Sequence, residues 1–375
     1  MTASLNNKLS TVKWGEFKIE NILKWQPQKE IDPLKLEILY DENENEYPFY
    51  GQSTTNNGII SFNKLSNTVL NNKNGNPTIL IHSNNQNIVY LETPFYLKDG
   101  HGATSVLQAE KLNRTNQMFI ISAIKKVISE KYSYNNKATK IELKNTLIKL
   151  PVKDGSADFE FMESFIAELE ANRIAELEGY LDATGLKNYN LTLEEETALN
   201  EFDKLHWKSF NLENLFGKST RGKRLKSADR IIGKLPFVTA GETETGVSAY
   251  IGNNVNVFSK NTTTIDMFGS AKYRNYSYGA DDHISVVHTE HLPKLAAVFV
   301  TSSIHKSSYS GKFSYARNFY PKDADELSIL LPSYGTDPDY KSMEILISAI
   351  QKLVIKDVVL YSANKKSDTK LVIFQ

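Results

Sequence analysis

The sequence contains one short segment twice, first as Trp14-Gly-Glu-Phe-Lys-Ile-Glu-Asn-Ile22 and again as Trp207-Lys-Ser-Phe-Asn-Leu-Glu-Asn-Leu215. Further matches follow each copy in the same order: Pro48-Phe49 with Pro236-Phe237, Gly58 with Gly246, Ser105-Val106 with Ser285-Val286, Phe119 with Phe299, and Met162-Glu163 with Met343-Glu344. Recurrence in a conserved order indicates an internal repeat. We therefore expect two copies of one fold, related by a pseudo-two-fold axis and suited to a target with two parts.

Bulk composition is typical of a globular protein with two domains. The chain has 375 residues, of which 40% are hydrophobic and 23% charged, and it contains no cysteine. This length allows two domains with substantial cores, and the lack of cysteine excludes disulfides, thiolate metal sites and a cysteine nucleophile. No apolar run approaches the roughly 18 residues of a membrane span, and residues 1–12 lack the apolar core of a signal peptide. We expect no membrane association, with the cytoplasm as the default compartment.

Charge is balanced overall but unevenly distributed along the chain. The 44 basic and 44 acidic residues cancel, yet residues 218–226 contain only cations among their charges, whereas residues 158–178 are strongly acidic. Such segregation allows one face to attract phosphate while another meets a different partner. The alternative is that both segments are ordinary solvated surface.

Hydrophobic patterning predicts a mixed α+β fold built from short elements. Each tryptophan segment is expected to enter a strand or a short helix, and residues 78–82 and 255–259 have the pattern of short strands. The apolar stretch 118–127 has helical spacing, and residues 295–304 are its counterpart in the second copy.

The segments 131–150 and 312–331 alternate in the manner of strand pairs. Each ends in a Leu-Pro pair, at Pro151 and at Pro332. Because proline lacks the amide that continues a ladder, we expect each pair of strands to stop there.

A long helix is predicted beyond each of these prolines. Asp158 and Asp339 are natural N-caps, because their carboxylates can accept from the unpaired first-turn amides. The expected apolar stripes comprise Phe161, Met162, Phe165, Ile166 and Leu169 in the first helix, and Met343, Leu346, Ile347, Ile350 and Leu353 in the second. We expect the stripes to pack on each other as an antiparallel, coiled-coil-like pair of spacer helices. The alternative is that each stripe caps its own domain. At ~1.5 Å per residue, about 25 residues give a strut of roughly 37 Å, close to one turn of duplex DNA.

Sequence motifs of enzymes are missing. Gly217-Lys218-Ser219 ends like a phosphate-binding loop, but Leu212 stands where the loop requires a glycine. Neither a dinucleotide-binding fingerprint nor a nucleophile elbow occurs, and no Asn-Pro-Pro-Tyr-like loop is present for methylating a base amine. His288 and His291 have no third metal ligand nearby, so both are interpreted as surface residues. The sequence therefore predicts no catalytic residue, no metal ligand and no cofactor.

Residues suited to binding phosphates and bases are more evident in the sequence than catalytic motifs. Cations at suitable spacing are candidate phosphate contacts: Lys218, Arg221, Lys223, Arg224, Lys226, Lys272 and Arg274. Polar and aromatic side chains in two matching loops and two predicted hairpins, 131–137 and 312–318, are further candidates for reading bases: Gln52, Thr54, Asn56, Asn57, Lys131, Tyr134, Lys137, Thr243, Glu244, Tyr273, Lys312, Tyr315 and Arg317. The alternative is that these segments are ordinary Asn-rich turns held by local side-chain bonds.

The chain resembles the DNA-specificity subunits of type I restriction-modification systems and the related recognition subunits of type IIB enzymes. The motifs that carry the resemblance are Trp25-Gln-Pro-Gln-Lys29, YPFYGQSTTNNGI at 47–59, IKLPVKDGSADFEFMESFI at 148–166, GKRLKSADR at 222–230 and LPFVTAGETETGV at 235–247. The likeness extends from Trp14 to about Leu360 and includes the duplication. The first copy departs from the second in lacking a dense basic run like that of residues 218–226.

This resemblance implies two target-recognition domains, residues 1–151 and 204–332, each reading one half of a split sequence in double-stranded DNA. Residues 152–203 would form spacer helix 1 and a linker, and residues 333–375 spacer helix 2 and a C-terminal tail. It further implies that the chain is no enzyme. Methyltransferase subunits would supply methylation with S-adenosylmethionine, and a restriction subunit would supply cleavage in the full complex. The competing hypothesis is a DNA-cleaving enzyme with an unrecognised nuclease site, and a protein-binding scaffold is a third.

Overall fold

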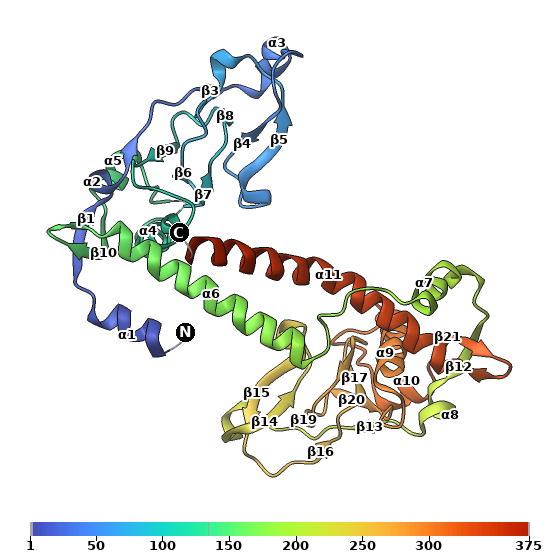
Figure 1. The fold of residues 1–375 in the computed structure, drawn as a ribbon. Helices are drawn as coiled ribbons and strands as arrows, with labels where there is room; N and C mark the ends of the chain where they lie inside the picture. Colours follow the sequence, from blue (N-terminus) through green and yellow to red (C-terminus); the bar gives the residue numbers. More distant parts are fainter. Residues whose placement is uncertain (1–2, 134, 374–375) are drawn as a thin grey trace. The chain divides into compact units, whose positions relative to one another are not determined.

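The computed structural model describes residues 3–133 and 135–373, with side chains up to Lys366, and it divides into two compact units (Figure 1). Unit 1 comprises residues 1–177 and 364–375, and unit 2 comprises residues 178–363. Within the described residues, no helix is both long and apolar enough to cross a bilayer.

Unit 1 begins with a short helix and ends in a long one. Its helices are α1 (Ala3–Thr11), α2 (Ile19–Ile22), α3 (Leu36–Leu39), α4 (Asn116–Lys131), α5 (Lys140–Asn145) and most of α6 (Phe159–Ala183). Its strands are β1 (Trp14–Lys18), β2 (Lys24–Trp25), β3 (Glu30–Ile31), β4 (Tyr47–Tyr50), β5 (Ile59–Asn63), β6 (Thr78–His82), β7 (Ile88–Leu91), β8 (Tyr96–Lys98), β9 (Thr104–Gln108), β10 (Leu147–Lys153) and β11 (Ser156–Ala157).

Unit 2 repeats this order. Its helices are α7 (Leu193–Asn200), α8 (Leu212–Phe216), α9 (Lys294–Ser308), α10 (Pro321–Asp325) and most of α11 (Tyr340–Ile373). Its strands are β12 (Trp207–Asn211), β13 (Thr220–Arg221), β14 (Ile232–Val238), β15 (Val247–Ile251), β16 (Val257–Phe258), β17 (Thr262–Asp266), β18 (Ala271–Arg274), β19 (Tyr278–Ala280), β20 (Ile284–Val287), β21 (Ser328–Tyr334) and β22 (Asp337–Pro338).

The sheets confirm the duplication that the sequence predicts. Unit 1 has sheets in the order β1-β10-β11, β2-β9-β6-β7 and β3-β8-β4-β5, and unit 2 has β12-β21-β22, β13-β20-β17-β18 and β16-β19-β14-β15. One edge differs. Strand β3 precedes β4 in the chain and runs parallel to β8, whereas β16 follows β15 and runs antiparallel to β19. The same edge position is therefore filled by unrelated segments, while the rest of the topology is kept.

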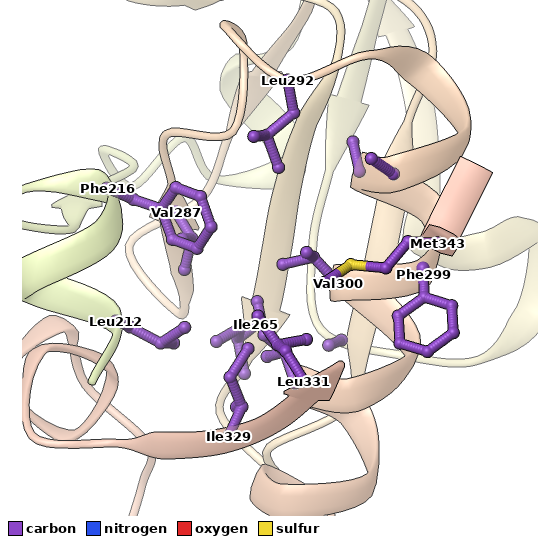
Figure 2. Packing of buried hydrophobic residues seen from close by; sticks show 14 of the residues in the cluster. Leu212, Phe216, Ile265, Val287, Leu292, Phe299, Val300, Ile329, Leu331 and Met343 are labelled. Atoms are coloured by element: carbon purple, nitrogen blue, oxygen red, sulfur yellow. The ribbon is translucent and has the colours of Figure 1, made fainter. Parts of the chain in front are cut away.

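Each unit has its main apolar core under the helix that the apolar stretch predicted. In unit 2, Ile265 of β17, Leu331 of β21 and Val300 of α9 point toward one another (Figure 2). In unit 1, Ile79 of β6 and Ile124 of α4 lie in the equivalent cluster, fully buried. Burying such a side chain contributes about 1.5–3 kcal/mol relative to exposure, so this cluster holds the helix on the sheet.

The predicted strand pairs at 131–150 and 312–331 are wrong. In unit 1 the segment contains the end of α4, a loop, helix α5 and the single strand β10, and in unit 2 it contains α10 and β21. Helix α5 begins at a complete capping box between Thr139 and Glu142, and this local interaction favours a helix over a strand.

The expectation that Pro151 and Pro332 end their strands is also wrong. Pro151 pairs with Trp14, and Pro332 with Trp207, as the end pair of each ladder, and both strands continue beyond the proline to pair with β11 and β22. The amide of Val152 donates to Lys13 O, so the alternation of an antiparallel ladder directs the missing amide of Pro151 away from β1. Proline therefore interrupts no hydrogen bond of that ladder.

The two long helices begin where the sequence predicts. The Asp158 carboxylate accepts from the Phe161 amide at 2.9 Å, and the Asp339 carboxylate accepts from the Ser342 amide at 3.0 Å. The boundary between the units falls inside both α6 and α11. Helix α11 continues to Ile373, through most of the segment expected to be a tail.

The start of each apolar stripe packs on its own unit, as the alternative reading held. Met162 belongs to the main core of unit 1, and Met343 and Leu346 belong to that of unit 2, so these residues are not reserved for helix pairing. Further along, Ile350 is 44% exposed and Leu353 is 49% exposed.

A short helix precedes each tryptophan strand and packs on the long helix of its unit. In unit 1, Leu5 of α1 lies against Phe165 and Ile166 of α6. In unit 2, α7 occupies part of the segment interpreted as linker, and the Glu195 carboxylate accepts from Lys352 Nζ at 2.7 Å and from Ser348 Oγ at 2.6 Å. Burial alone would raise the pKa of Glu195, but hydrogen bonds from Lys352, Ser348 and the Thr192 amide outweigh it and lower the pKa to about 2.

We predict that Lys352→Met destabilises unit 2 by about 3 kcal/mol or more, because it leaves a buried carboxylate without its cation. Chemical denaturation followed by Trp207 fluorescence measures this change. The stabilisation by the native pair should persist above pH 4.5 and fade as the pH drops toward 2, because protonation of Glu195 breaks the pair. Lys8→Met is the matched control: its pair with Glu168 joins α1 to α6 but lies on the surface, so little change is expected. Equal losses in the two variants would contradict the prediction.

Candidate nucleic-acid interface

The basic segment 218–226 is an exposed, extended stretch attached to unit 2 by its backbone. Strand β13 pairs with β20, and the Lys223 amide donates to Ala280 O at 2.9 Å. A Cβ at Gly222 would lie 2.2 Å from Asp281 O and 2.3 Å from Ala280 O, so only glycine permits this close approach. All five cations of the segment are exposed: Lys218, Arg221, Lys223, Arg224 and Lys226.

Asp282 contacts two of these cations, Arg221 and Arg224. Its backbone oxygen accepts from Arg221 Nε, and its carboxylate lies 3.9 Å from the guanidinium groups of both Arg221 and Arg224. Arg221 also lies over the Tyr320 ring at 5.2 Å. These contacts and the pairing of β13 with β20 hold Arg221 and Arg224 against unit 2.

Asp281, Asp282 and His283 are the His and carboxylate groups that lie close enough to share an ion in the part of the chain that the structure describes. The imidazole of His283 is 3.4 Å from the Asp282 carboxylate. Because Asp282 already faces two arginines, its charge is explained without a metal. The consecutive Asp281-Asp282-His283 is the signal of this cluster in the sequence.

A strained turn recurs at the same place in both units, between β4 and β5 and between β14 and β15. Asn56 and Asn57 have φ values of 48° and 51° and precede Gly58 at 84°, and in unit 2 Glu244, Thr245 and Gly246 have 49°, 54° and 84°. We name these the 56–58 turn and the 244–246 turn. Consecutive left-handed residues other than glycine are rare, and a β-branched residue such as Thr245 is an outlier there. Such strain persists where surrounding structure enforces it, often at functional sites.

The tips of both turns are presented to solvent. Thr54, Asn56 and Asn57 are exposed in unit 1, as are Thr243 and Glu244 in unit 2, whereas Gln52 is partly buried. Each glycine is buried, and a Cβ on it would lie 3.1 Å from Gly51 O in unit 1 or 2.7 Å from Thr239 O in unit 2. Exposed amide, hydroxyl and carboxylate groups on a fixed backbone suit hydrogen bonding to base edges.

Amide side chains hold the 56–58 turn from beneath. Asn85 donates to Gln52 O at 2.9 Å and Asn87 donates to Ser53 O at 3.0 Å. His82, at the end of β6, is fully buried and hydrogen-bonds with Thr104 Oγ1 through Nδ1 at 2.9 Å. Burial lowers the pKa of His82 to about 4, so its imidazole is neutral near pH 7.

Charged side chains hold the 244–246 turn. Arg274 Nη1 donates to Thr245 O at 2.9 Å, and the Lys272 ammonium lies 3.1 Å from Glu242 and 3.7 Å from Asp266. Asp266, which is the counterpart of His82, accepts from the Gly241 amide at 3.4 Å.

The structure corrects three expected DNA contacts on β18. Arg274 is only 1% exposed and its donors go to Thr264, Thr245 and Tyr276, so it is not a phosphate anchor. The Lys272 side chain is 14% exposed and ion-paired. Tyr273 donates to Asn261 and packs on the main core of unit 2. These residues support the turn instead of facing a ligand.

The chain is similar to known proteins in sequence and in fold. Residues 11–179 match the family model described as the type I restriction modification DNA specificity domain. The chain is 23% identical over 354 residues to the type II restriction enzyme specificity subunit S.BcgI of Heyndrickxia coagulans, a match covering 92% of this chain and 96% of the relative. In fold it resembles the type I restriction-modification S subunit of M. genitalium, with a TM-score of 0.58 at 12% identity, over 96% of this chain and 94% of that one.

Beyond β18, the remaining candidate contacts of the two units lie at the end of α4 and in the segments that follow α4 and α9. In unit 1, Lys131 and Lys137 are exposed, and Tyr134 lies outside the described residues. In unit 2, Lys312 is exposed and Tyr315 is 84% exposed, with its ring edge-on to Phe268.

The Arg317 side chain is ion-paired within unit 2, whereas the sequence predicts that it is available to DNA. Its guanidinium forms an ion pair with Asp323 at the start of α10, and this hydrogen bond raises the pKa of Arg317. Its part in DNA contact stays a prediction, with fewer donors available.

Arg230 is a connecting residue that the sequence interpretation did not single out. Its guanidinium donates to Leu225 O at 3.3 Å and to Ser248 Oγ at 3.2 Å. It therefore ties the basic segment to β15, directly after the 244–246 turn. Its place at the end of the motif GKRLKSADR was the available signal.

We predict that unit 1 loses about 3 kcal/mol of stability as the pH falls from 6.5 to about 4, because unfolded His82 takes up a proton that the buried imidazole resists. Hydrogen exchange of the β6 amides as a function of pH resolves this unit from the other. The variant His82→Gln should flatten the profile in that window. His101→Gln, which changes a 95% exposed side chain of the same unit, serves as the control and should leave the slope intact. A slope unaffected by H82Q would refute the assignment.

Proposed function

We propose that the chain is the DNA sequence-recognition subunit of a restriction-modification complex. In this role each unit reads one half of a bipartite duplex target, and the chain has no catalysis of its own. The observation that carries the proposal is the repeated exposed turn at 56–58 and 244–246 in a chain related over almost its full length to a specificity subunit. Two copies of one fold suit a target with two half-sites.

The described side chains of unit 2 support separate roles in anchoring phosphates and in reading bases. Lys218, Arg221, Lys223, Arg224 and Lys226 would anchor phosphates, which fixes position without reading sequence. The tip of the 244–246 turn, with Thr243 and Glu244, would read base edges, since hydroxyl and carboxylate groups can pair with them in the major groove. The 56–58 turn, with Gln52, Thr54, Asn56 and Asn57, would do the same for the other half-site.

Helices α6 and α11 would set the gap between the half-sites by pairing along their apolar stripes. The placement of the unit boundary inside both helices supports this role, because they are the covalent connection on which any spacing depends. Leu169 of α6 and Ile350 and Leu353 of α11 lie beyond Met162 and Leu346, which serve the two cores, and they are the candidates for the pairing. Phe161 and Phe165 pack with Leu5 of α1 instead.

Partner subunits would supply the chemistry. Methyltransferase subunits with bound S-adenosylmethionine would modify the target, and a restriction subunit would cut it. Exposed carboxylates on α6, such as Glu163 and Glu176, give that helix a surface unsuited to phosphate but suited to a protein partner.

The basic segment yields a quantitative prediction. Neutralising Arg221, Lys223 and Arg224 with glutamine should weaken binding to every duplex sequence alike and reduce the slope of log K against log salt by about 3, because each phosphate contact contributes about 0.9. Fluorescence anisotropy with specific and random duplexes from 50 to 200 mM salt measures both effects.

The matched control replaces Lys204, Lys341 and Lys356 with glutamine, removing the same charge from exposed positions in the helical region. This control should keep the slope of the wild type. Equal slopes for both triple variants would show that residues 218–226 do not lie on the DNA.

A segment exchange tests the assignment of one half-site to each unit. Replacing residues 1–150 with those of a relative that has a different target should change one half of the methylated sequence and leave the other half intact. Methylome sequencing of cells carrying the exchanged gene gives the answer directly. Alteration of both halves would contradict the modular reading.

A further inference from the structure

The two exposed turns have the same backbone but rest on different chemistry. Beneath each glycine lies a basic nitrogen: a Cβ on Gly58 would lie 3.7 Å from His82 Nε2, and a Cβ on Gly246 would lie 3.8 Å from Arg274 Nη2. The nitrogen is a neutral imidazole in unit 1 and a guanidinium in unit 2.

Strand register shows that Arg274 is specific to unit 2. Thr78 of β6 pairs with Leu91, and the equivalent Thr262 of β17 pairs with Arg274. By the same register Lys272 stands where unit 1 has Val89. Leu91 and Val89 lie in an apolar cluster, so the fold itself requires no charge at either position.

Burying this guanidinium is costly. Arg274 is 1% exposed, and among the described residues it forms no ion pair with a carboxylate. Its hydrogen bonds go to neutral groups: Thr264 Oγ1 at 2.9 Å, Thr245 O at 2.9 Å and the Tyr276 hydroxyl at 3.0 Å. A buried charge of this kind rarely adds net stability compared with an apolar residue. It does, however, hold the carbonyl of the strained residue Thr245 in one place.

We propose that Arg274 is a positioning residue that determines the sequence specificity of the half-site read by unit 2. It acts through Thr245 O, which fixes the left-handed backbone and thereby the directions of the Thr243 and Glu244 side chains. In unit 1 the amides of Asn85 and Asn87 perform the equivalent task on Gln52 and Ser53. This inference rests on the proposed function, because it requires the turns to read DNA.

The test uses the assembled complex and a duplex library randomised in both half-sites. Arg274→Lys retains the charge but cannot bond Thr264 and Thr245 together, and Arg274→Leu introduces the residue of unit 1. Both should reduce discrimination in the half-site of unit 2 by about tenfold, the scale of one lost base contact. Discrimination in the other half-site should be unchanged, which provides an internal control for folding and assembly.

Two further measurements separate positioning from a loss of structure in unit 2. The salt slope of binding should stay at the wild-type value, because the basic segment remains in place. Val300→Ala, which opens a cavity in the main core of unit 2 away from the turn, should lower stability and keep discrimination.

A third variant acts on the strain itself. Thr245→Asn places the residue of the 56–58 turn in the 244–246 turn, where asparagine tolerates a positive φ better than threonine does. In the Arg274→Lys background it should restore at least half of the lost discrimination, because the backbone then holds its conformation without the guanidinium.

The outcomes are distinct. If the wild-type complex discriminates both half-sites and the Arg274 variants do so equally well, the inference is overturned while the proposed function stands. Loss of discrimination in both half-sites, or an equal loss in Val300→Ala, also overturns it. If the wild-type complex shows no bipartite preference at all, the proposed function itself fails.

Discussion

The pairing of the first strand of each unit with the long strand near its end is the constraint on which the rest of the structure depends. Trp14–Lys18 pairs with Leu147–Pro151, and Trp207–Asn211 pairs with Ser328–Pro332. This ladder closes a domain whose intervening segments are mostly short strands and loops. It also leads directly into the long helix, because β10 turns through β11 to the Asp158 cap and β21 turns through β22 to the Asp339 cap. The orientation of each helix on its unit therefore follows from the closure of that unit.

Beside this closing ladder the two units share an aromatic contact and differ in a polar contact. Trp14 stacks on Phe119 at 6.2 Å and Trp207 on Phe299 at 6.3 Å, so the contact beside the closing ladder is the same in both. The short helix before each tryptophan strand is also kept, yet its polar contact is reversed. Helix α1 supplies Lys8 to a carboxylate, whereas α7 supplies the carboxylate of Glu195 to a lysine. Both short helices pack on the long helix of their unit. The cation of the pair lies on the short helix in unit 1 and on the long helix in unit 2.

The sequence was most informative where structure is decided locally. The strand Thr78–His82 and the caps Asp158 and Asp339 follow from alternation and from the chemistry of the helix start. Helix α7 was missed although Thr192 and Glu195 form a capping box, because the Asn-rich stretch around it favoured a linker. The prediction for residues 131–150 is wrong for a similar reason: their alternation favours strands, whereas the capping box of Thr139 and Glu142 starts a helix.

Long-range interactions account for what the sequence could not predict about the site. Lys272 and Arg274 have the composition of a phosphate track, and only their acceptors, Glu242, Asp266 and Thr245 O, show that they point inward. By contrast, the cations at 218–226 follow Gly217 in a segment with no apolar period, and they are exposed. Exposure of a charge follows from the absence of a competing interaction, whereas burial requires specific partners distant in the chain.

The burial of Lys272 and Arg274 is informative about function, because the stability of the fold does not require these cations. Unit 1 shows that this fold is satisfied by Leu91 at the position of Arg274 and by Val89 at the position of Lys272. Unit 2 thus has two cations where unit 1 has an apolar pair, and its turn contains Thr245, the residue least suited to a left-handed backbone. Both units have the left-handed turn, but only unit 2 combines a β-branched residue in it with a buried cation that holds its carbonyl. Their joint presence is most simply explained by the need to present one particular surface at the 244–246 turn.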